Sequence, residues 1–284
     1  MGQASGAGVD ASIAVVRRAL DLGVNLFDSA EIYQTEEILG KALKGIPRDR
    51  VFVSTKKTAY EGATPIPPAD FRAGVEKCLS RLGMDRVDIF HFHAVLPDQY
   101  PHVRENLLPE LRKMRDEGKV RFLGITEAFG TDCGHAMLSR ALQDDCWDAA
   151  MVGFNILNQS ARERVFPLAM EKGIGTLVMF AVRKALGNPA NFWTTIADLA
   201  AKGLAKIDPD MPDFVLRESG TRSLPEVAYR FCRHEPGVDV VLSGTGSLAH
   251  LEENARSLSA PPLPETVAAR LREAFAGIDS VSGG

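Results

Sequence analysis

The chain has 284 residues, of which 45% are hydrophobic and 25% are charged, and its formal net charge is −4. This length predicts one domain, residues 1–284, with a single large core, and the small negative charge gives no reason to expect a nucleic acid or an anionic membrane as partner. Four widely spaced cysteines indicate reduced thiols in the cytoplasm, and no apolar run approaches the roughly 20 residues of a membrane span.

The first elements form a helix between two predicted strands. An amphipathic helix is expected from Asp10 to Leu22, followed by a buried strand from Val24 to Phe27. After a loop and a second helix, the sequence VFVST at residues 51–55 predicts another buried strand. The residues that follow these strands and carry chemistry are Asp28, Tyr33 and Lys56.

An acid, a phenol and an amine at strand ends predict a proton donor. In barrels of alternating parallel strands and helices, the reactive groups lie on the loops after the C-terminal ends of the strands. An ammonium at Lys56, held by Asp28, is expected to lower the pKa of the Tyr33 phenol toward working pH. Tyr33 is therefore predicted to act as a general acid toward a carbonyl oxygen.

The rest of the chain repeats the alternation of strand and helix. Further strands are predicted at residues 86–93, 118–126, 147–154, 175–180 and 238–242. Helices of ordinary length lie between them, which favours parallel βαβ units and an α/β fold of the (β/α)8 barrel type. The pattern gives about seven strands where a closed barrel needs about eight. Residues 183–222, interrupted by prolines, predict a loop insertion over the C-terminal ends of the strands, and the tail VSGG is expected to be loose.

A resemblance to a known family begins at the first predicted strand. The sequence GVNLFDSA at residues 23–30, then Tyr33, Glu36-Glu37, Leu39-Gly40 and Ala42-Leu43 resemble the first signature of the aldo-keto reductases. The resemblance implies an NAD(P)H-dependent oxidoreductase that interconverts an aldehyde or ketone and its alcohol, with Asp28, Tyr33, Lys56 and His93 as catalytic residues. Strand alternation points Lys57 the other way, so it is expected to be solvated.

The same resemblance bears on the start of the chain. Aldo-keto reductases normally begin with a hairpin and a first barrel strand, which would precede the helix at Asp10. The sequence therefore predicts an N-terminally truncated, open barrel of seven strands, or a natural start further upstream.

The cofactor residues are predicted partly from physics and partly from the resemblance. Residues 244–247 follow a strand and open a helix, where backbone amides receive a pyrophosphate. The resemblance implies NADP as cofactor, and NAD remains an alternative because no cation lies in that loop. The predicted cofactor-binding residues are Thr126, Asn155, Phe180, Gly244, Thr245, Gly246, Ser247, Glu253 and Asn254. Glu127 and Met151 depart from the family, which usually has amide side chains there.

Two other functions are open on the sequence. A barrel that binds the cofactor without turnover would explain the departures at Glu127 and Met151. A metal-dependent hydrolase could use His91 and His93, since an H-x-H pair at a strand end also begins zinc sites. The histidines elsewhere do not match strand ends, so no metal ligand is predicted, and His91 is expected to pack in the interior. The expected partner is a small carbonyl or alcohol substrate.

Overall fold

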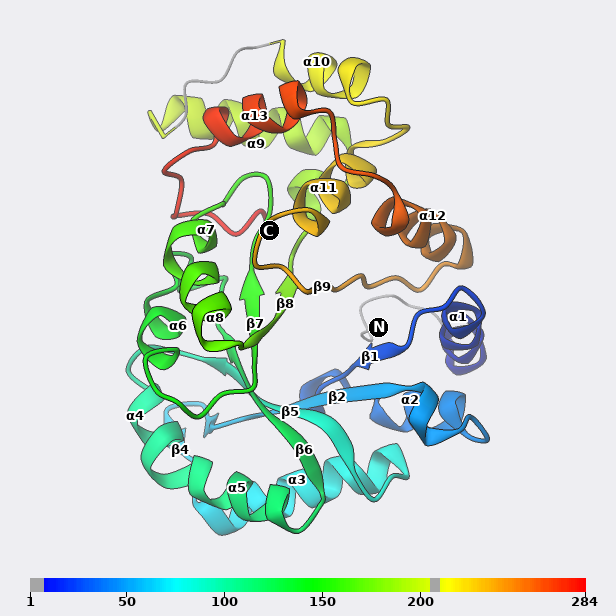
Figure 1. Cartoon of the computed structure of the whole chain (residues 1–284), viewed down its shortest axis with the longest axis vertical. Coiled ribbons are helices and arrows are strands. Elements are labelled where there is room, and N and C mark those ends of the chain that lie inside the picture. The colour runs from blue at the N-terminus through cyan, green and yellow to red at the C-terminus, as the bar shows by residue number, and fades with distance from the viewer. Residues whose placement is uncertain (1–7, 205–209) are drawn as a thin grey trace. The chain divides into compact units, whose positions relative to one another are not determined.

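The computed structural model describes residues 8–204 and 210–284, and within them seven parallel strands form one sheet in the order β1-β2-β5-β6-β7-β8-β9 (Figure 1). The strands are β1 (Leu26–Asp28), β2 (Phe52–Thr58), β5 (Val87–Val95), β6 (Val120–Glu127), β7 (Ala149–Gly153), β8 (Gly175–Met179) and β9 (Val240–Val241). Helices alternate with these strands, so the predicted α/β class and strand number are confirmed. The prediction that no strand precedes Asp10 concerns in part residues 1–7, which lie outside the described residues.

The chain divides into two compact units, and the boundary falls inside β7. Unit 1 comprises the described part of Met1–Ala128 with Asp144–Ala150 and Gly244–Glu252. Unit 2 comprises Phe129–Gln143, the described part of Met151–Ser243, and Glu253–Gly284. The single domain over residues 1–284 stays a prediction.

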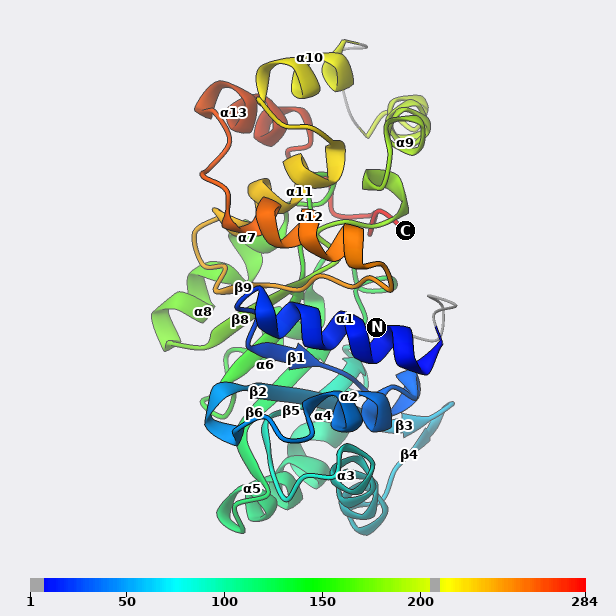
Figure 2. The same ribbon diagram turned by 90° about the vertical axis from the view of Figure 1, so that its right-hand side faces the viewer.

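In unit 1 the helices pack side by side against the sheet. They are α1 (Val9–Asp21), α2 (Glu36–Leu43), α3 (Pro68–Leu82), α4 (Tyr100–His102) and α5 (Leu108–Asp116), with a π-helical stretch at Val103–Leu107. Helix α1 packs against α2, and α2 against α3 (Figure 2). Each residue of β2 from Val53 to Lys57 is buried, so side chains on both faces of this strand are covered, as is usual in parallel sheets.

Helix α3 shows how the sequence fixes these elements. Pro68 occupies the first turn, where its missing amide hydrogen is not needed, and Gly83 ends the helix with a left-handed backbone at φ +63°. Phe71 and Val75 lie on its buried face, and the Phe71 ring stacks on Phe92 of β5 with centroids 4.9 Å apart. Prolines at positions 67 and 68 predict a helix from there to about Leu82, and the structure has it at Pro68–Leu82.

A short hairpin between β2 and α3 was not anticipated. Strands β3 (Tyr60–Glu61) and β4 (Thr64–Pro65) pair antiparallel around a two-residue turn. Gly62 adopts φ +61° at the first turn position, which tight hairpin turns of this kind require. The strands are too short for an alternating pattern to reveal them.

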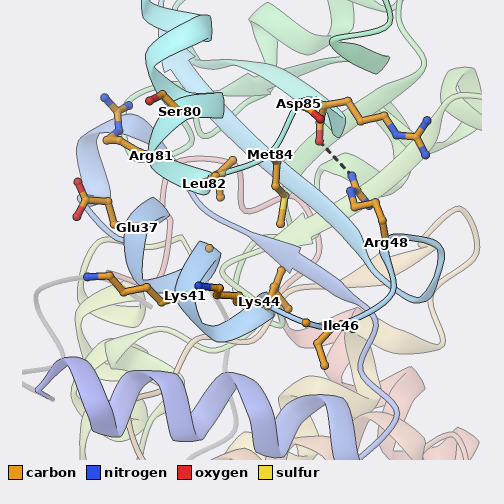
Figure 3. A pocket seen from close by; sticks show the side chains of 15 residues that line it. Glu37, Lys41, Lys44, Ile46, Arg48, Ser80, Arg81, Leu82, Met84 and Asp85 are labelled. Carbon is orange, nitrogen blue, oxygen red and sulfur yellow. Dashed lines mark hydrogen bonds between the residues drawn. The ribbon is translucent and has the colours of Figure 1, made fainter.

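A cavity of about 980 Å³ lies in unit 1 where the strands begin, between the last turns of α2 and α3 (Figure 3). Lys41 of α2, Lys44 directly after α2, and Arg81 of α3 line it. Cations near helix C-termini are stabilised by the helix dipole, and Arg81 also pairs with the buried Glu36 at 2.6 Å. This cavity lies at the opposite ends of the strands from Asp28 and Lys56, away from the face on which barrels of this type carry their reactive groups.

Unit 2 contains the remaining helices. They are α6 (Ala136–Ala141), α7 (Ala161–Arg164), α8 (Phe166–Lys172), α9 (Pro189–Ala201), α10 (Met211–Glu218), α11 (Leu224–Arg233) and α13 (Glu265–Ala274), while α12 (Leu248–Ser259) spans the boundary. Within residues 183–222 the structure gives α9 and α10, residues 205–209 lie outside the described residues, and the insertion over the strand ends stays a prediction. No helix in the described part of the chain has the length and apolar character needed to cross a membrane.

The spacing of Ser223 with Glu226, and of Ser160 with Glu163, predicts a capping box at the start of α11 and another at the start of α7, and the second prediction is wrong. The Ser223 hydroxyl accepts the amide hydrogen of Glu226 at 3.4 Å and caps α11 as expected. Ser160 does not cap α7, because its hydroxyl instead donates to Asn158 Oδ1 at 2.6 Å. A nearby side-chain acceptor has displaced the local capping bond.

Candidate active site

The side chains at the ends of β1 and β2 form a buried ion pair. Lys56 is 1% exposed, and its ammonium donates to Asp28 Oδ2 and, at 2.6 Å, to the Ser29 carbonyl oxygen. The other oxygen of Asp28 accepts from the Ser54 hydroxyl at 2.8 Å. Parallel pairing sets Asp28 opposite Ser54, which places the carboxylate beside the lysine that follows two residues later. Burying the Lys56 ammonium away from water is costly unless a counter-charge, here the Asp28 carboxylate, lies beside it.

Tyr33 and His93 complete the cluster. Tyr33 ends a 3-10 turn, and Gln34 then adopts a left-handed backbone at φ +54°. The Tyr33 hydroxyl lies 3.5 Å from His93 Nε2, and the two rings meet edge to face. The Lys56 ammonium lies 5.0 Å from the Tyr33 ring centroid. The structure therefore brings together the four residues predicted as catalytic, all within unit 1.

Burial governs the charge states of this cluster. Burial, and then the Asp28 carboxylate, raise the pKa of Tyr33 to about 12. Burial, and then the Lys56 ammonium, lower the pKa of His93 to about 4. The expectation that Lys56 draws the Tyr33 pKa downward is wrong for this structure, because Asp28 offsets the ammonium charge and the hydroxyl is desolvated. At neutral pH the cluster holds a protonated phenol beside a neutral imidazole.

His91 packs in the interior, as expected. It is 0% exposed, and its pKa lies well below the usual value because of burial and the charges of Lys56 and His93, with the Ile125 backbone working in the opposite direction. Gly124 on β6 provides the space, since a Cβ there would lie 2.2 Å from His91 Nδ1. Within residues 8–204 and 210–284, no group of three or more His, Cys, Asp or Glu side chains is placed to hold a metal ion.

Lys57 is not solvated, which corrects the prediction. Its side chain is 8% exposed, and its ammonium donates to Glu31 Oε2 at 2.7 Å. The alternation of the strand does point it away from Lys56, but α3 covers that face. Gly74 of α3 leaves room for the lysine stem, because a Cβ at that glycine would lie 2.3 Å from Lys57 Cε.

Of the residues predicted to bind the cofactor, Thr126 lies in unit 1 beside the cluster. It is 1% exposed, and its hydroxyl oxygen accepts the amide hydrogen of Ala94 at 2.7 Å. Glu127 and Met151, the two departures from the family, are 2% and 3% exposed.

Asn155 and Phe180 lie together in unit 2. The Asn155 amide donates to the carbonyl oxygen of Phe180 at 3.2 Å and to that of Ser282 at 3.1 Å. Its oxygen accepts the amide hydrogen of Leu157 at 2.9 Å. Phe180 is half-buried with a left-handed backbone at φ +66°, and the Arg183 guanidinium lies 4.0 Å from its ring centroid.

The tail after residue 280 is held in place, although it was expected to be loose. The Asn158 amide donates to the Val281 carbonyl oxygen at 2.9 Å, and the Ala185 amide hydrogen bonds to the Gly283 carbonyl oxygen at 3.1 Å. Together with the Asn155 bond to Ser282, these contacts fix three successive residues. Side chains distant in sequence supply two of the three donors, so local composition did not reveal them.

The predicted phosphate loop opens α12. In unit 1 the Thr245 hydroxyl accepts the amide hydrogen of Ser247 at 3.0 Å, and the Ser247 hydroxyl accepts that of His250 at 3.4 Å. Gly244 has no atom within 4 Å of where a Cβ would stand, so its surface is open. This loop at a helix N-terminus fits a pyrophosphate.

Glu253 and Asn254 lie on the part of α12 that belongs to unit 2. The Asn254 amide donates to the Ser243 hydroxyl at 2.9 Å, and the Glu253 carbonyl oxygen accepts from the Ser257 hydroxyl at 2.8 Å.

Comparison with known proteins gives one consistent family. The model of the aldo/keto reductase family matches residues 6–276. L-galactose dehydrogenase of Arabidopsis thaliana is 26% identical over 260 residues, which cover 88% of this chain and 78% of that protein. A probable aldo-keto reductase 1 of Glycine max is 29% identical over 171 residues, 57% of this chain and 47% of that protein.

Solved structures share the fold. An aldo-keto reductase of Bacillus halodurans in its holo form has a TM-score of 0.70 at 22% identity, covering 94% of this chain and 87% of its own. An aldo-keto reductase of Klebsiella pneumoniae in complex with NADPH has a TM-score of 0.70 at 19% identity, covering 96% and 88%. The barrel-type fold predicted from the sequence is confirmed by these likenesses.

Proposed function

Because this chain belongs to the aldo/keto reductase family, we propose that it interconverts an aldehyde or ketone and the corresponding alcohol with NADPH. The observation that carries the proposal is the cluster in unit 1, in which a buried ammonium–carboxylate pair adjoins a protonated phenol and a neutral imidazole. The bound nicotinamide supplies the hydride, and the chain supplies the proton and the alignment.

Tyr33 is the proposed proton donor. With its pKa raised to about 12, the phenol keeps its proton at neutral pH and presents it to the substrate oxygen. As hydride reaches the carbonyl carbon, that oxygen becomes an alkoxide, which is a stronger base than a tyrosinate, and it takes the Tyr33 proton. Lys56 then stabilises the tyrosinate, since its ammonium lies 5.0 Å from the ring centroid.

His93 is proposed to orient the substrate oxygen. Its Nδ1 atom is buried without a hydrogen-bond partner among the described residues, whereas Nε2 faces the Tyr33 hydroxyl. A buried N–H without an acceptor is less tolerable than a buried lone pair, which favours the proton on Nε2. An Nε2–H group beside Tyr33 would donate to the same carbonyl oxygen that receives the phenol proton.

The cofactor is proposed to be NADP, with NAD as the alternative. The loop at Gly244–Ser247 would hold the pyrophosphate, and Glu253 with Asn254 would lie at the adenine end. Phe180 offers a ring for stacking on the nicotinamide, and Asn155 lies beside it. The Klebsiella pneumoniae neighbour in complex with NADPH supports NADP.

The test is the Tyr33→Phe variant. NADPH oxidation with a panel of test aldehydes should fall by roughly 10²- to 10⁴-fold, because the proton donor is removed. The dissociation constant for NADPH, measured by protein fluorescence, should stay near that of the wild type. Tyr60→Phe is the matched control, since Tyr60 lies on the hairpin against the His102 ring. Unchanged turnover in Tyr33→Phe would remove Tyr33 from this role.

A second candidate is a barrel that binds the dinucleotide without turnover. The burial of Glu127 and Met151, where the family usually presents amide side chains, favours it. Wild-type protein that binds NADPH but oxidises it with no carbonyl compound would support this candidate.

A further inference from the structure

Strand β5 contains an irregularity directly after His93. Phe92 pairs with Ile125 of β6, and Val95 pairs with Glu127. Two residues of β5, His93 and Ala94, therefore stand opposite one residue of β6, Thr126. Such a bulge redirects the side chains around it and is frequent beside active sites.

The bulge requires an uncommon backbone. Ala94 adopts φ +51°, a left-handed conformation that residues with a Cβ avoid unless their surroundings impose it. The amide hydrogen of Ala94 leaves the regular strand ladder at this point, and it donates instead to Thr126 Oγ1 at 2.7 Å. Since Thr126 is 1% exposed, water does not replace that acceptor readily.

The position of His93 depends on this local geometry. Its Nε2 atom lies 3.5 Å from the Tyr33 hydroxyl, which is the outer limit of a hydrogen bond. A small change in the backbone at residues 93 and 94 would therefore break the contact. His93 Nδ1 has no hydrogen-bond partner among the described residues, so the position of the ring depends on its backbone and on the Tyr33 contact.

We propose that Thr126 is a positioning residue, whose hydroxyl holds the Ala94 bulge and thereby sets the His93 imidazole against Tyr33. The inference rests on the proposed function, and it differs from the role implied by family resemblance, in which this residue binds the nicotinamide carboxamide. The oxygen of Thr126 serves the protein backbone, so its removal should disturb the proton-transfer geometry before it disturbs cofactor binding.

The test compares Thr126→Val with Thr126→Ser. Valine keeps the shape and lacks the acceptor, whereas serine keeps the acceptor. Thr126→Val should lower kcat by roughly 10- to 100-fold, as expected for a misplaced catalytic group. Thr126→Ser should retain kcat, and both variants should bind NADPH within about twofold of the wild type. Thr176→Val is the control, because Thr176 is also a buried strand threonine and its hydroxyl bonds to Gly237 in unit 2; it should leave kcat unchanged.

Two outcomes would overturn the proposal. One is a Thr126→Val variant with normal kcat at saturating NADPH and a clearly weaker NADPH affinity, which would make Thr126 a cofactor ligand. The other is equal kcat in the valine and serine variants. If the wild type reduces no carbonyl compound, the proposed function fails separately, and NMR of the histidine rings decides the inference. The His93 signals should then move in Thr126→Val and not in Thr126→Ser, and unmoved signals in both would overturn it.

Discussion

Lowering the pH from 7.5 to 5 should weaken the folded state through His93. The folded protein holds the pKa of His93 at about 4, against an ordinary value of 6.5, because burial and Lys56 disfavour the charged ring. Between these two pKa values, His93 is therefore protonated in the unfolded chain and neutral in the folded chain. The contribution of the neutral His93 ring to the free energy of unfolding is fully present above pH 6.5. It falls as the pH is lowered and is lost below about pH 4.

The size of the effect follows from the two pKa values. One pKa unit corresponds to about 1.4 kcal/mol, so the full loss is about 3 kcal/mol and the loss at pH 5 is about 2 kcal/mol. His93 is only 8% exposed, so screening by solvent reduces the predicted loss of stability only slightly. His91 acts in the same direction. Against a typical stability of about 5–15 kcal/mol, the change is large enough to measure.

The assay is urea unfolding of the wild type and of His93→Gln at pH 7.5, 6 and 5. Glutamine does not titrate, and all other groups, including His91, remain in both proteins. The wild type should lose about 2 kcal/mol more than His93→Gln between pH 7.5 and 5. Equal losses in the two proteins would show that the His93 ring is not held neutral by its surroundings.

The buried ion pair and the packing of His91 give two further predictions. Asp28→Asn should destabilise the protein by about 3–5 kcal/mol in urea unfolding, because it leaves the Lys56 charge buried without its partner. The double variant Asp28→Asn with Lys56→Met should recover part of that loss. If the effects of the two substitutions are fully additive, the two residues are not a coupled pair. Gly124→Ala should lower the free energy of unfolding by about 1–3 kcal/mol, measured by thermal unfolding, since the new Cβ would lie 2.2 Å from His91 Nδ1. The control Gly130→Ala should be neutral, because no atom lies within 4 Å of its Cβ position. Equal melting temperatures of the two variants would contradict this packing.

The elements at the strand ends could be anticipated because their signals are local. Asp28 and Lys56 each follow an apolar run of strand length, and parallel strands bring their C-terminal ends to one edge. The proline and glycine that bound α3 act within a turn of where they stand. Such features need only neighbouring residues, so the sequence alone was sufficient for them.

The features that could not be anticipated depend on residues far apart in the chain. Lys57 is buried because α3 places Gly74 against it. The pKa of Tyr33 rises because the fold desolvates the hydroxyl and sets Asp28 near it. The bulge at Ala94 depends on a hydroxyl 32 residues away. No periodicity along the chain encodes these distances.

The fixed tail also has a consequence for biosynthesis. Asn155 donates a hydrogen bond to Ser282, 127 positions later, and Asn158 donates one to Val281, 123 positions later. A ribosome adding about 5–20 residues per second would synthesise that stretch in roughly 6 to 25 seconds. During this interval both carboxamides lack these partners, so unit 2 can complete its native contacts only after residues 281 and 282 have been synthesised.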